Sequence, residues 1–192
     1  MINIAVILGS TRPGRNGEAV AKWVLETARK RTDATFELVD LADYRLPNFD
    51  EPLPPVTGQY SKPHTHRWSN AVDAFDGYVF VTPEYNRAVP GALKNAVDFL
   101  FREWNNKAAG FVSYGASGGH HAAANLRMML SELLVAHVRT ELNLSLYTDF
   151  EHFSVFKPKP IHEQMLNKML DELIAWSGAL RGLRAASPQN AG

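Results

Sequence analysis

Short apolar runs alternate with helical segments along this chain, and the alternation limits the fold more than any other feature. The first run, Met1–Leu8, is rich in β-branched residues and stops at Gly9, as expected of a strand buried on both faces. Four further runs have the length of strands, at 35–41, 77–82, 107–113 and 138–146. Helical patterns follow them, at 17–31, 64–75, from Pro90, at 118–136 and from Pro160. The order βαβαβαβαβα predicts an α/β fold, a three-layer sandwich around a five-stranded parallel sheet.

Length and composition fit one domain with a full core. The chain has 192 residues, of which 45% are apolar. We expect a single domain over 1–184, and the small, polar residues 185–192 predict a disordered tail. A proline-rich segment, 46–63, interrupts the alternation with five prolines in eighteen positions, too many for a helix or a central strand. A long ordered loop of this kind is usually functional or covers a partner surface.

Charge and cysteine content exclude several classes of protein. Lys and Arg together equal Asp and Glu at 20 each, which is neither the basic footprint of a nucleic-acid binder nor the acidic balance of a small electron carrier. The sequence has no cysteine, so disulfides, thiol catalysis and Cys-ligated metals are excluded. No apolar run approaches the ~20 residues of a membrane span, and the first residues lack a signal-peptide pattern. We therefore expect a cytoplasmic protein without nucleic-acid or membrane partners.

Three loops leave the carboxyl ends of predicted strands, where open parallel sheets bind ligands. The first, Gly9–Gly17, contains two hydroxyls, an amide and two guanidinium groups, and leads into a helix for which Asn16 is the expected N-cap. Guanidinium groups and the N–H groups of a helix N-terminus bind phosphate, so this loop predicts an anion site. It lacks the Lys-Ser/Thr pair of a P-loop and the G-x-G-x-x-G of a Rossmann site, which argues against both.

The second loop, Thr82–Gly91, combines two prolines with a tyrosine and an asparagine. It predicts a stiff wall against which a planar ligand can lie. A proline-stiffened surface turn fits the same composition equally well.

The third loop, Ser113–Gly119, has three glycines within five positions, which lets the backbone approach a flat ring closely. The segment 115–119 also fits the G-x-S-x-G nucleophile elbow of α/β-hydrolases, with Ser117 as nucleophile and Asp149 with His152 or His162 as partners. The chain is short for that fold and shows no oxyanion-hole glycine run after an earlier strand. A Ser117 hydrolase is therefore the weaker alternative.

Taken in order, these loops resemble the NAD(P)H-dependent FMN reductase family, a flavodoxin-like group that also contains azo-, quinone- and chromate-reducing members. The resemblance runs across residues 2–180 and rests on the segments Leu8–Arg15, Phe49–Pro54, Pro83–Asn86, Pro90–Asp98 and Ser113–Gly115. It implies the strand order 2-1-3-4-5 and one FMN per subunit. It also implies hydride transfer from NADPH or NADH to FMN, then electron transfer to a second acceptor such as free flavin, a quinone or an azo compound. Because the flavin carries this chemistry, no catalytic side chain is expected.

The resemblance also assigns the cofactor-binding residues. The FMN phosphate would be held by the first loop, through Ser10, Arg12, Asn16 and Gly17, with Arg15 on that phosphate or on a phosphate of NADPH. The isoalloxazine would be lined on one side by Pro83, Glu84, Tyr85 and Asn86, and on the other by Ser113, Tyr114, Gly115 and Gly118. Glu84 is expected to present its backbone rather than to act as an acid.

A non-enzymatic flavodoxin-type electron carrier is the alternative function, but zero net charge and the proline-rich segment favour the reductase. No metal site is expected, since the histidines at 64, 66, 120 and 121 have neither cysteines nor a carboxylate cluster beside them. The segment 118–136 is apolar on more than one helical face, and the family commonly forms dimers or tetramers. We therefore expect a homodimer or homotetramer that acts on a small-molecule acceptor.

Overall fold

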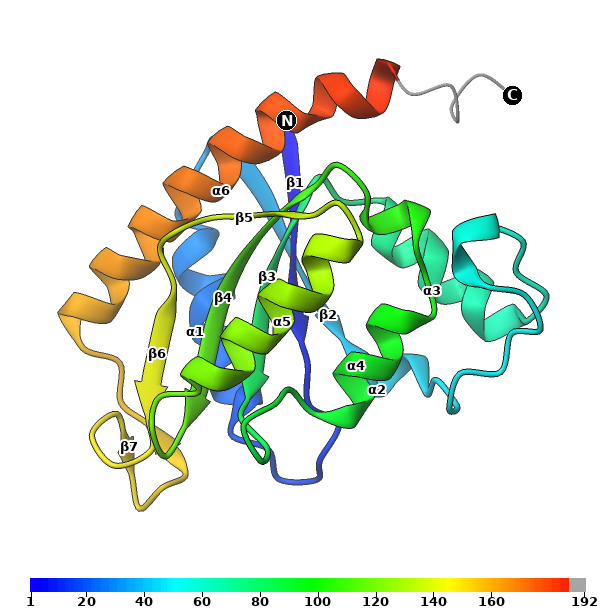
Figure 1. Cartoon of the computed structure of the whole chain (residues 1–192). Helices are drawn as coiled ribbons and strands as arrows, with labels where there is room; N and C mark the ends of the chain where they lie inside the picture. Colours follow the sequence, from blue (N-terminus) through cyan, green and yellow to red (C-terminus); the bar gives the residue numbers. More distant parts are fainter. Residues whose placement is uncertain (187–192) are drawn as a thin grey trace.

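A computed structural model describes residues 1–186, in which a parallel sheet lies between two layers of helices (Figure 1). The strands are β1 (Ile2–Leu8), β2 (Ala34–Asp40), β3 (Gly77–Pro83), β4 (Ala108–Gly115), β5 (Ala136–His137) and β6 (Leu142–Ser145). Their order is β2-β1-β3-β4-β5, and β6 also pairs with β4. The predicted fold class and strand order are therefore confirmed.

Helices cover both faces of this sheet. One face carries α1 (Gly17–Ala28) and α6 (Pro160–Ala186), and the other carries α3 (Pro63–Asp73), α4 (Gly91–Asp98) and α5 (His120–Glu132). In β1, Ile4 and Val6 belong to the first core, whereas Ala5 and Ile7 belong to the second. Successive side chains of a strand point to opposite faces, so a strand covered on both faces must be apolar throughout.

The fifth predicted strand, 138–146, is wrong as a single element. Two short strands, β5 and β6, pair with β4 instead, and the register jumps by two residues between Ala109↔His137 and Val112↔Leu142. In the gap, the Glu172 carboxylate accepts hydrogen bonds from the N–H (2.9 Å) and the hydroxyl (2.6 Å) of Thr140. Side chains thus satisfy backbone groups that a continuous strand would pair with its neighbour.

Two predicted helices are shorter than expected. The helix predicted over 17–31 ends at Ala28, and the one predicted over 118–136 spans 120–132. Gly118 and Gly119 have φ of 81° and 80°, and Leu134 has φ of 55°, so left-handed residues bound α5 at both ends. Ala185 and Ala186 still belong to α6, and the rest of the predicted tail, 187–192, lies outside the described residues.

Several short elements were not predicted. They are α2 (Leu41–Tyr44), two 3₁₀ turns (Pro55–Thr57 and Arg102–Trp104), and a hairpin of β7 (Phe150–Glu151) and β8 (Val155–Phe156). The hairpin lies below the lower end of β6 in Figure 1, beside the ends of the strands.

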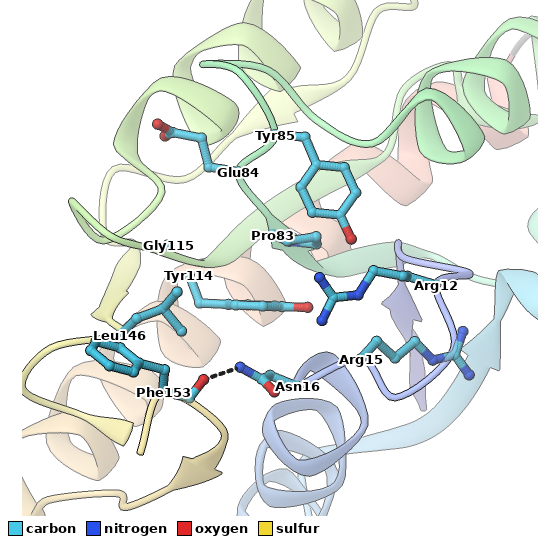
Figure 2. A pocket seen from close by; sticks show the side chains of 10 residues that line it. All are labelled: Arg12, Arg15, Asn16, Pro83, Glu84, Tyr85, Tyr114, Gly115, Leu146 and Phe153. Atoms are coloured by element: carbon cyan, nitrogen blue, oxygen red, sulfur yellow. Dashed lines mark hydrogen bonds between the residues drawn. The ribbon is translucent and has the colours of Figure 1, made fainter. Parts of the chain in front are cut away.

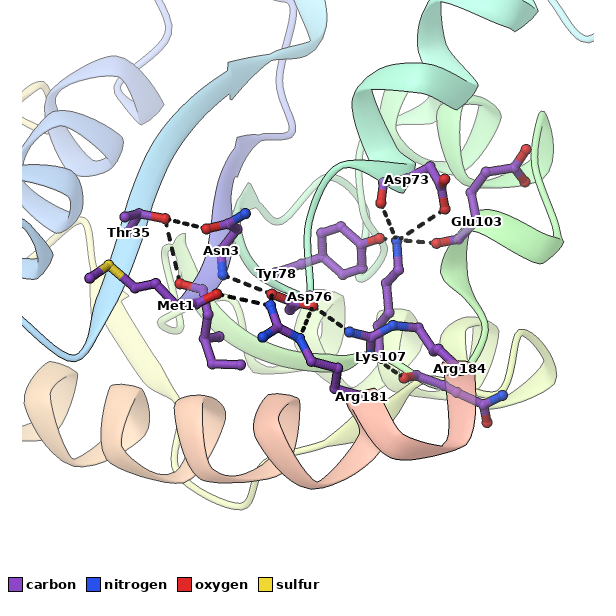
Figure 3. A network of polar contacts seen from close by, with 12 residues as sticks. Met1, Asn3, Thr35, Asp73, Asp76, Tyr78, Glu103, Lys107, Arg181 and Arg184 are labelled. Carbon is purple, nitrogen blue, oxygen red and sulfur yellow. Dashed lines mark hydrogen bonds and ion pairs between the residues drawn. The ribbon is translucent and has the colours of Figure 1, made fainter. Parts of the chain in front are cut away.

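A polar network closes the amino-terminal edge of the sheet (Figure 3). The Asp76 carboxylate accepts hydrogen bonds from the Asn3 N–H (2.9 Å), from Arg181 (2.6 Å) and from Arg184. The buried ammonium of Lys107 donates to the carbonyl oxygens of Val72 (3.1 Å) and Asp73 (3.2 Å) at the end of α3, and burial lowers its pKa to about 8. These contacts fasten α6 and α3 to the sheet.

The proline-rich segment is tied to the core by the buried side chain of Glu51. Its carboxylate accepts hydrogen bonds from the N–H (2.8 Å) and hydroxyl (2.8 Å) of Ser61 and from the N–H of Lys62 (3.0 Å), immediately before α3. Burial acts to raise the pKa of Glu51, but the Thr65 hydroxyl together with these hydrogen bonds outweighs burial and lowers the pKa to about 2.

The substitution Glu51→Ala is expected to lower the free energy of unfolding by ~1–3 kcal/mol at neutral pH, because it leaves buried donors unsatisfied. The pKa of Glu51 is lower in the folded chain, so its contribution is complete above about pH 5 and is lost as the pH falls toward 2. Urea unfolding of both proteins between pH 7 and pH 3 should show this difference shrinking. Glu37→Ala, at an exposed position in β2, is the control; a difference independent of pH would contradict the assignment.

Candidate functional site

A cavity of about 280 Å³ opens at the carboxyl ends of β1, β3 and β4 (Figure 2). Its walls come from the three loops that the sequence predicts to bind a ligand and from the segment that contains the hairpin. The lining residues are Arg12, Arg15, Asn16, Pro83, Glu84, Tyr85, Tyr114, Gly115, Leu146 and Phe153. The loops meet because neighbouring parallel strands bring their carboxyl ends to one edge of the sheet. Five expected site residues, Ser10, Gly17, Asn86, Ser113 and Gly118, do not line this cavity.

The first wall is the amino end of α1. Asn16 occupies the N-cap position, but its side chain does not cap the helix; the amide Nδ2 donates instead to the carbonyl oxygen of Phe153 at 2.7 Å. The predicted N-cap position is therefore confirmed, but a tertiary contact takes the side chain expected to cap the helix. Asn16 therefore does not cap the N–H groups of the first helical turn, of which that of Gly17 faces the Tyr114 hydroxyl. With the helix dipole, the remaining groups favour an anion beside the cavity.

The two arginines of the first loop have different surroundings. The Arg15 guanidinium donates to the Ser10 carbonyl oxygen and forms ion pairs with Asp40 and with Glu18 (3.0 Å). In the described part of the chain, the Arg12 guanidinium makes no hydrogen bond or ion pair, and in Figure 2 it points toward the Tyr114 hydroxyl. Arg12 is thus available to a ligand, whereas Arg15 holds the loop against the end of β2.

Tyr114 forms the floor of the cavity. Its ring is buried, and burial raises the pKa of its phenol, so the hydroxyl stays protonated at neutral pH. A Cβ on Gly17 would lie 2.7 Å from the Tyr114 hydroxyl oxygen and 2.7 Å from Cδ1 of Leu8. Gly17 therefore acts by letting α1 approach the floor closely.

The second wall is a tight turn. Tyr85 and Ala88 exchange backbone hydrogen bonds of 2.9 and 3.0 Å, and the central residues Asn86 and Arg87 have φ of 51° and 65°. The turn aims the Tyr85 ring at the cavity, where its hydroxyl oxygen lies 3.2 Å from Oγ of the buried Ser10. Asn86 shapes this turn.

Glu84 joins the second wall to the third. Its carboxylate accepts hydrogen bonds from the N–H groups of His121 (3.0 Å) and Ala122 (3.3 Å), and so caps α5. Its own N–H donates to the Tyr114 carbonyl oxygen at 2.9 Å. The Glu84 carboxylate therefore has a structural role, and the role of this residue toward a ligand stays a prediction.

The third wall is the glycine-rich turn before α5. The buried Ser113 hydroxyl donates to the Gly118 carbonyl oxygen (2.9 Å) and accepts from the Asn143 amide (2.8 Å) behind the cavity. A Cβ on Gly119 would lie 2.8 Å from the backbone nitrogen of Tyr114, so this turn requires glycine there. Ser113 and Gly118 therefore support the wall from behind.

The hydrolase alternative finds no support. Ser117 is exposed, and within residues 1–186 no hydrogen bond joins it to a histidine. Asp149 pairs instead with Lys159 (2.6 Å) and His162 (3.5 Å).

Two lining residues, Leu146 and Phe153, were missed by sequence reasoning. The sequence feature that could have indicated them is the group of aromatic residues at 147, 150 and 153 among polar neighbours. Across the described residues, no cluster of three His, Asp or Glu side chains is arranged to hold a metal ion. Nor is any helix there long and apolar enough to cross a membrane.

Residues 2–149 match the family model for NADPH-dependent FMN reductases. The chain belongs to this family. It is accordingly an NAD(P)H-dependent flavoprotein reductase, and FMN and NAD(P)H are its cofactors, as the resemblance of its loops implied. Among relatives of this reductase, an NAD(P)H-dependent FMN reductase from Nectria is 40% identical over 158 residues, covering 78% of this chain and 79% of the relative.

Two further similarities extend the comparison. A quinone reductase from Pseudomonas putida is 34% identical over 137 residues, covering 67% of this chain and 69% of the relative. The solved structure of FerB, an NAD(P)H:(acceptor) oxidoreductase from Paracoccus denitrificans, superposes with a TM-score of 0.73 at 21% identity, covering 93% of this chain and 98% of that one. The reductase thus shares the fold of FerB.

The residues around the cavity fit FMN. The uncapped end of α1 and the Arg12 guanidinium offer donors to a phosphate. The Tyr85 ring and the backbone at Gly115 both line the cavity, so a flat ring would meet an aromatic side chain and a segment without a side chain.

The substitution Gly17→Ala is expected to lower the free energy of unfolding by ~1–3 kcal/mol, because the added methyl overlaps Leu8 and Tyr114. Gly91→Ala is the matched control: it also changes the first residue of a helix, but a Cβ there meets nothing within 4 Å. Denaturant unfolding should separate the two variants clearly. Equal stability of both would contradict the close approach of α1 to the floor.

Proposed function

We propose that the cavity holds one FMN, with its phosphate on the first loop and its ring between the second and third walls. The observation that carries this proposal is the uncapped end of α1 beside the unpaired Arg12 guanidinium, both opening onto the Tyr114 floor. Ser10, Asn16 and Gly17 complete the phosphate loop, and Arg15 positions it through Asp40. Pro83, Tyr85, Gly115 and the turn residues behind them line the ring.

Bound FMN supplies a ring that takes electrons from NAD(P)H and passes them to a second substrate. The residues of the chain itself would bind FMN and orient it. Arg12 and the α1 N–H groups neutralise the phosphate, Tyr85 and Tyr114 exclude water from two sides, and Glu84 keeps the second and third walls in register. We assign no side chain a catalytic proton transfer, because Glu84 is held by α5 and burial keeps the Tyr114 phenol protonated.

We propose a small planar acceptor such as a quinone as the second substrate. Support comes from relatives described as quinone reductases, including one from Escherichia coli and a 2-hydroxy-1,4-benzoquinone reductase from Burkholderia. The net reaction is NAD(P)H plus H⁺ plus quinone to NAD(P)⁺ plus hydroquinone, so one hydride and one solvent proton account for the two hydrogens gained. We place the enzyme in the cytoplasm, where NAD(P)H is available and where a protein needs no disulfide.

We also propose that the reductase forms a homodimer or homotetramer through α5. This helix buries Ala122, Leu126 and Leu130 against the sheet and leaves Met128 73% exposed, with Leu134 beyond it 58% exposed. Exposed apolar side chains grouped on one surface mark contact sites.

The purified protein, loaded with FMN and desalted, should retain flavin absorption bands that bleach within seconds on anaerobic addition of NADPH. Arg12→Ala is expected to raise the Kd for FMN at least about tenfold, because a charge-assisted hydrogen bond to phosphate is lost. Arg139→Ala, at an exposed position outside the cavity, should leave the Kd unchanged. Bands that are retained but do not bleach would instead indicate an electron carrier.

Light scattering after gel filtration should give the mass of a dimer or tetramer for the wild type. Met128→Glu is expected to shift it toward the monomer, because a charge at the contact must be desolvated. Ile161→Glu, on an exposed part of α6, is the control and should leave the mass unchanged. A wild type of monomer mass would overturn this assignment.

A further inference from the structure

Two exposed aromatic side chains, one on the hairpin and one just before it, lie together beside the cavity. Phe153, between β7 and β8, lines the cavity and is 58% exposed. Tyr147 is 69% exposed and meets it edge to face, with ring centroids 5.5 Å apart. The match to the family model stops at residue 149, so the hairpin lies outside the matched segment. We call the pair Tyr147 and Phe153 the aromatic lip.

The base of the hairpin is part of the core. Phe150 is buried and packs against Phe156 across the hairpin, with ring centroids 5.2 Å apart, and against Tyr114 of the cavity floor at 6.1 Å. Phe156 in turn contacts Trp23 of α1 edge to face at 5.4 Å. The hairpin is therefore anchored to both the floor and the first wall.

The tip is held in one backbone conformation. His152 and Phe153 have φ of 51° and 59°, a region that costs a residue with a side chain free energy and persists only where other contacts impose it. The contacts here are the hydrogen bond from the Asn16 amide to the Phe153 carbonyl oxygen (2.7 Å) and that from the Ser154 N–H to the Glu151 carbonyl oxygen (3.1 Å). The Phe153 ring is thus pre-positioned over the cavity (Figure 2).

Charge divides the surroundings of the cavity into two sides. On the hairpin side, Lys157 pairs with Glu151 at 2.9 Å, and Lys159 pairs with Asp149 at 2.6 Å. Around the first and second loops, the guanidinium groups of Arg12, Arg45 and Arg87 make no hydrogen bond or ion pair within residues 1–186. The phosphates of a nicotinamide nucleotide are attracted to the arginine side, which leaves the lip to an uncharged ring.

We propose that Tyr147 and Phe153 bind the planar ring of the electron acceptor, and so decide which acceptors this reductase prefers. An aromatic surface that is exposed yet rigidly held gains most by stacking on another ring, because little conformational entropy is lost on binding. The proposal rests on the proposed function, since it names the recognition element for the acceptor of the same site.

Steady-state kinetics with two acceptors test the lip. Phe153→Ala and Tyr147→Ala should each raise the KM for menadione, a planar quinone, about fivefold. The KM for ferricyanide, which has no ring to stack, should stay within twofold, as should the KM for NADPH. Phe153→Trp should restore the KM for menadione. Val155→Ala, exposed on the same hairpin but away from the cavity lining, is the matched control.

A binding measurement separates recognition from turnover. Calorimetric titration of the FMN-loaded protein with 2-naphthol, which NADPH cannot reduce, should give a Kd about fivefold weaker in Phe153→Ala than in the wild type. An unchanged KM for menadione and an unchanged Kd for 2-naphthol in the variants would overturn the proposed role of the aromatic lip. A rise in the KM for NADPH alone would also overturn it, and would indicate that the lip binds the adenine ring of NADPH. Failure of NADPH to bleach bound flavin in the wild type would overturn the proposed function, while the 2-naphthol titration would still report on the lip.

Discussion

In the part of the chain that the structure describes, the polar groups at one edge of the buried parallel sheet are hydrogen-bonded within the protein, whereas several at the other edge are not. This difference separates the part of the molecule that stabilises the fold from the part that forms the site. Both faces are covered by helices, so polar side chains and backbone groups gather where strands begin and end. At the amino edge, Asp76 and Lys107 are fully engaged with neighbouring backbone and arginine groups. At the carboxyl edge, the Asn16 side chain does not cap α1, and within residues 1–186 the Arg12 guanidinium makes no hydrogen bond or ion pair. The edge whose polar groups are hydrogen-bonded stabilises the fold. The edge with unpaired donors can bind a ligand.

The two arginines of the first loop have different roles: one stabilises the loop and the other is available to a ligand. Arg15 is committed to Asp40 and to the Ser10 carbonyl oxygen, which fixes the loop before any ligand arrives. Arg12, three residues earlier, stays available to a phosphate. Pre-organisation of this kind reduces the ordering cost of binding, because a loop that is already fixed loses less conformational freedom. Glu84 does the same for the ring side by capping α5 with its carboxylate.

The hairpin extends the same principle beyond the part of the chain that matches the family model. Its base packs on the cavity floor through Phe150, and its tip is tied to α1 through Asn16. The site is thus assembled from the three loops of the matched segment and from a hairpin that follows that segment. Such an arrangement allows acceptor preference to vary while the machinery for the cofactor stays the same.

The sequence by itself determined the alternation of buried strands with helices and the three loops of the site, because two-sided burial and glycine spacing are local patterns. The strand order followed from the resemblance of these loops to the family. Tertiary structure alone decided that Asn16 binds Phe153 rather than capping α1, and that the last strand splits where Glu172 takes the Thr140 backbone. Each of these outcomes depends on a partner 32 or more residues away in the chain, the separations being 137 for Asn16 and 32 for Thr140. Local periodicity contains no information about such partners, since folding alone brings them within hydrogen-bonding distance.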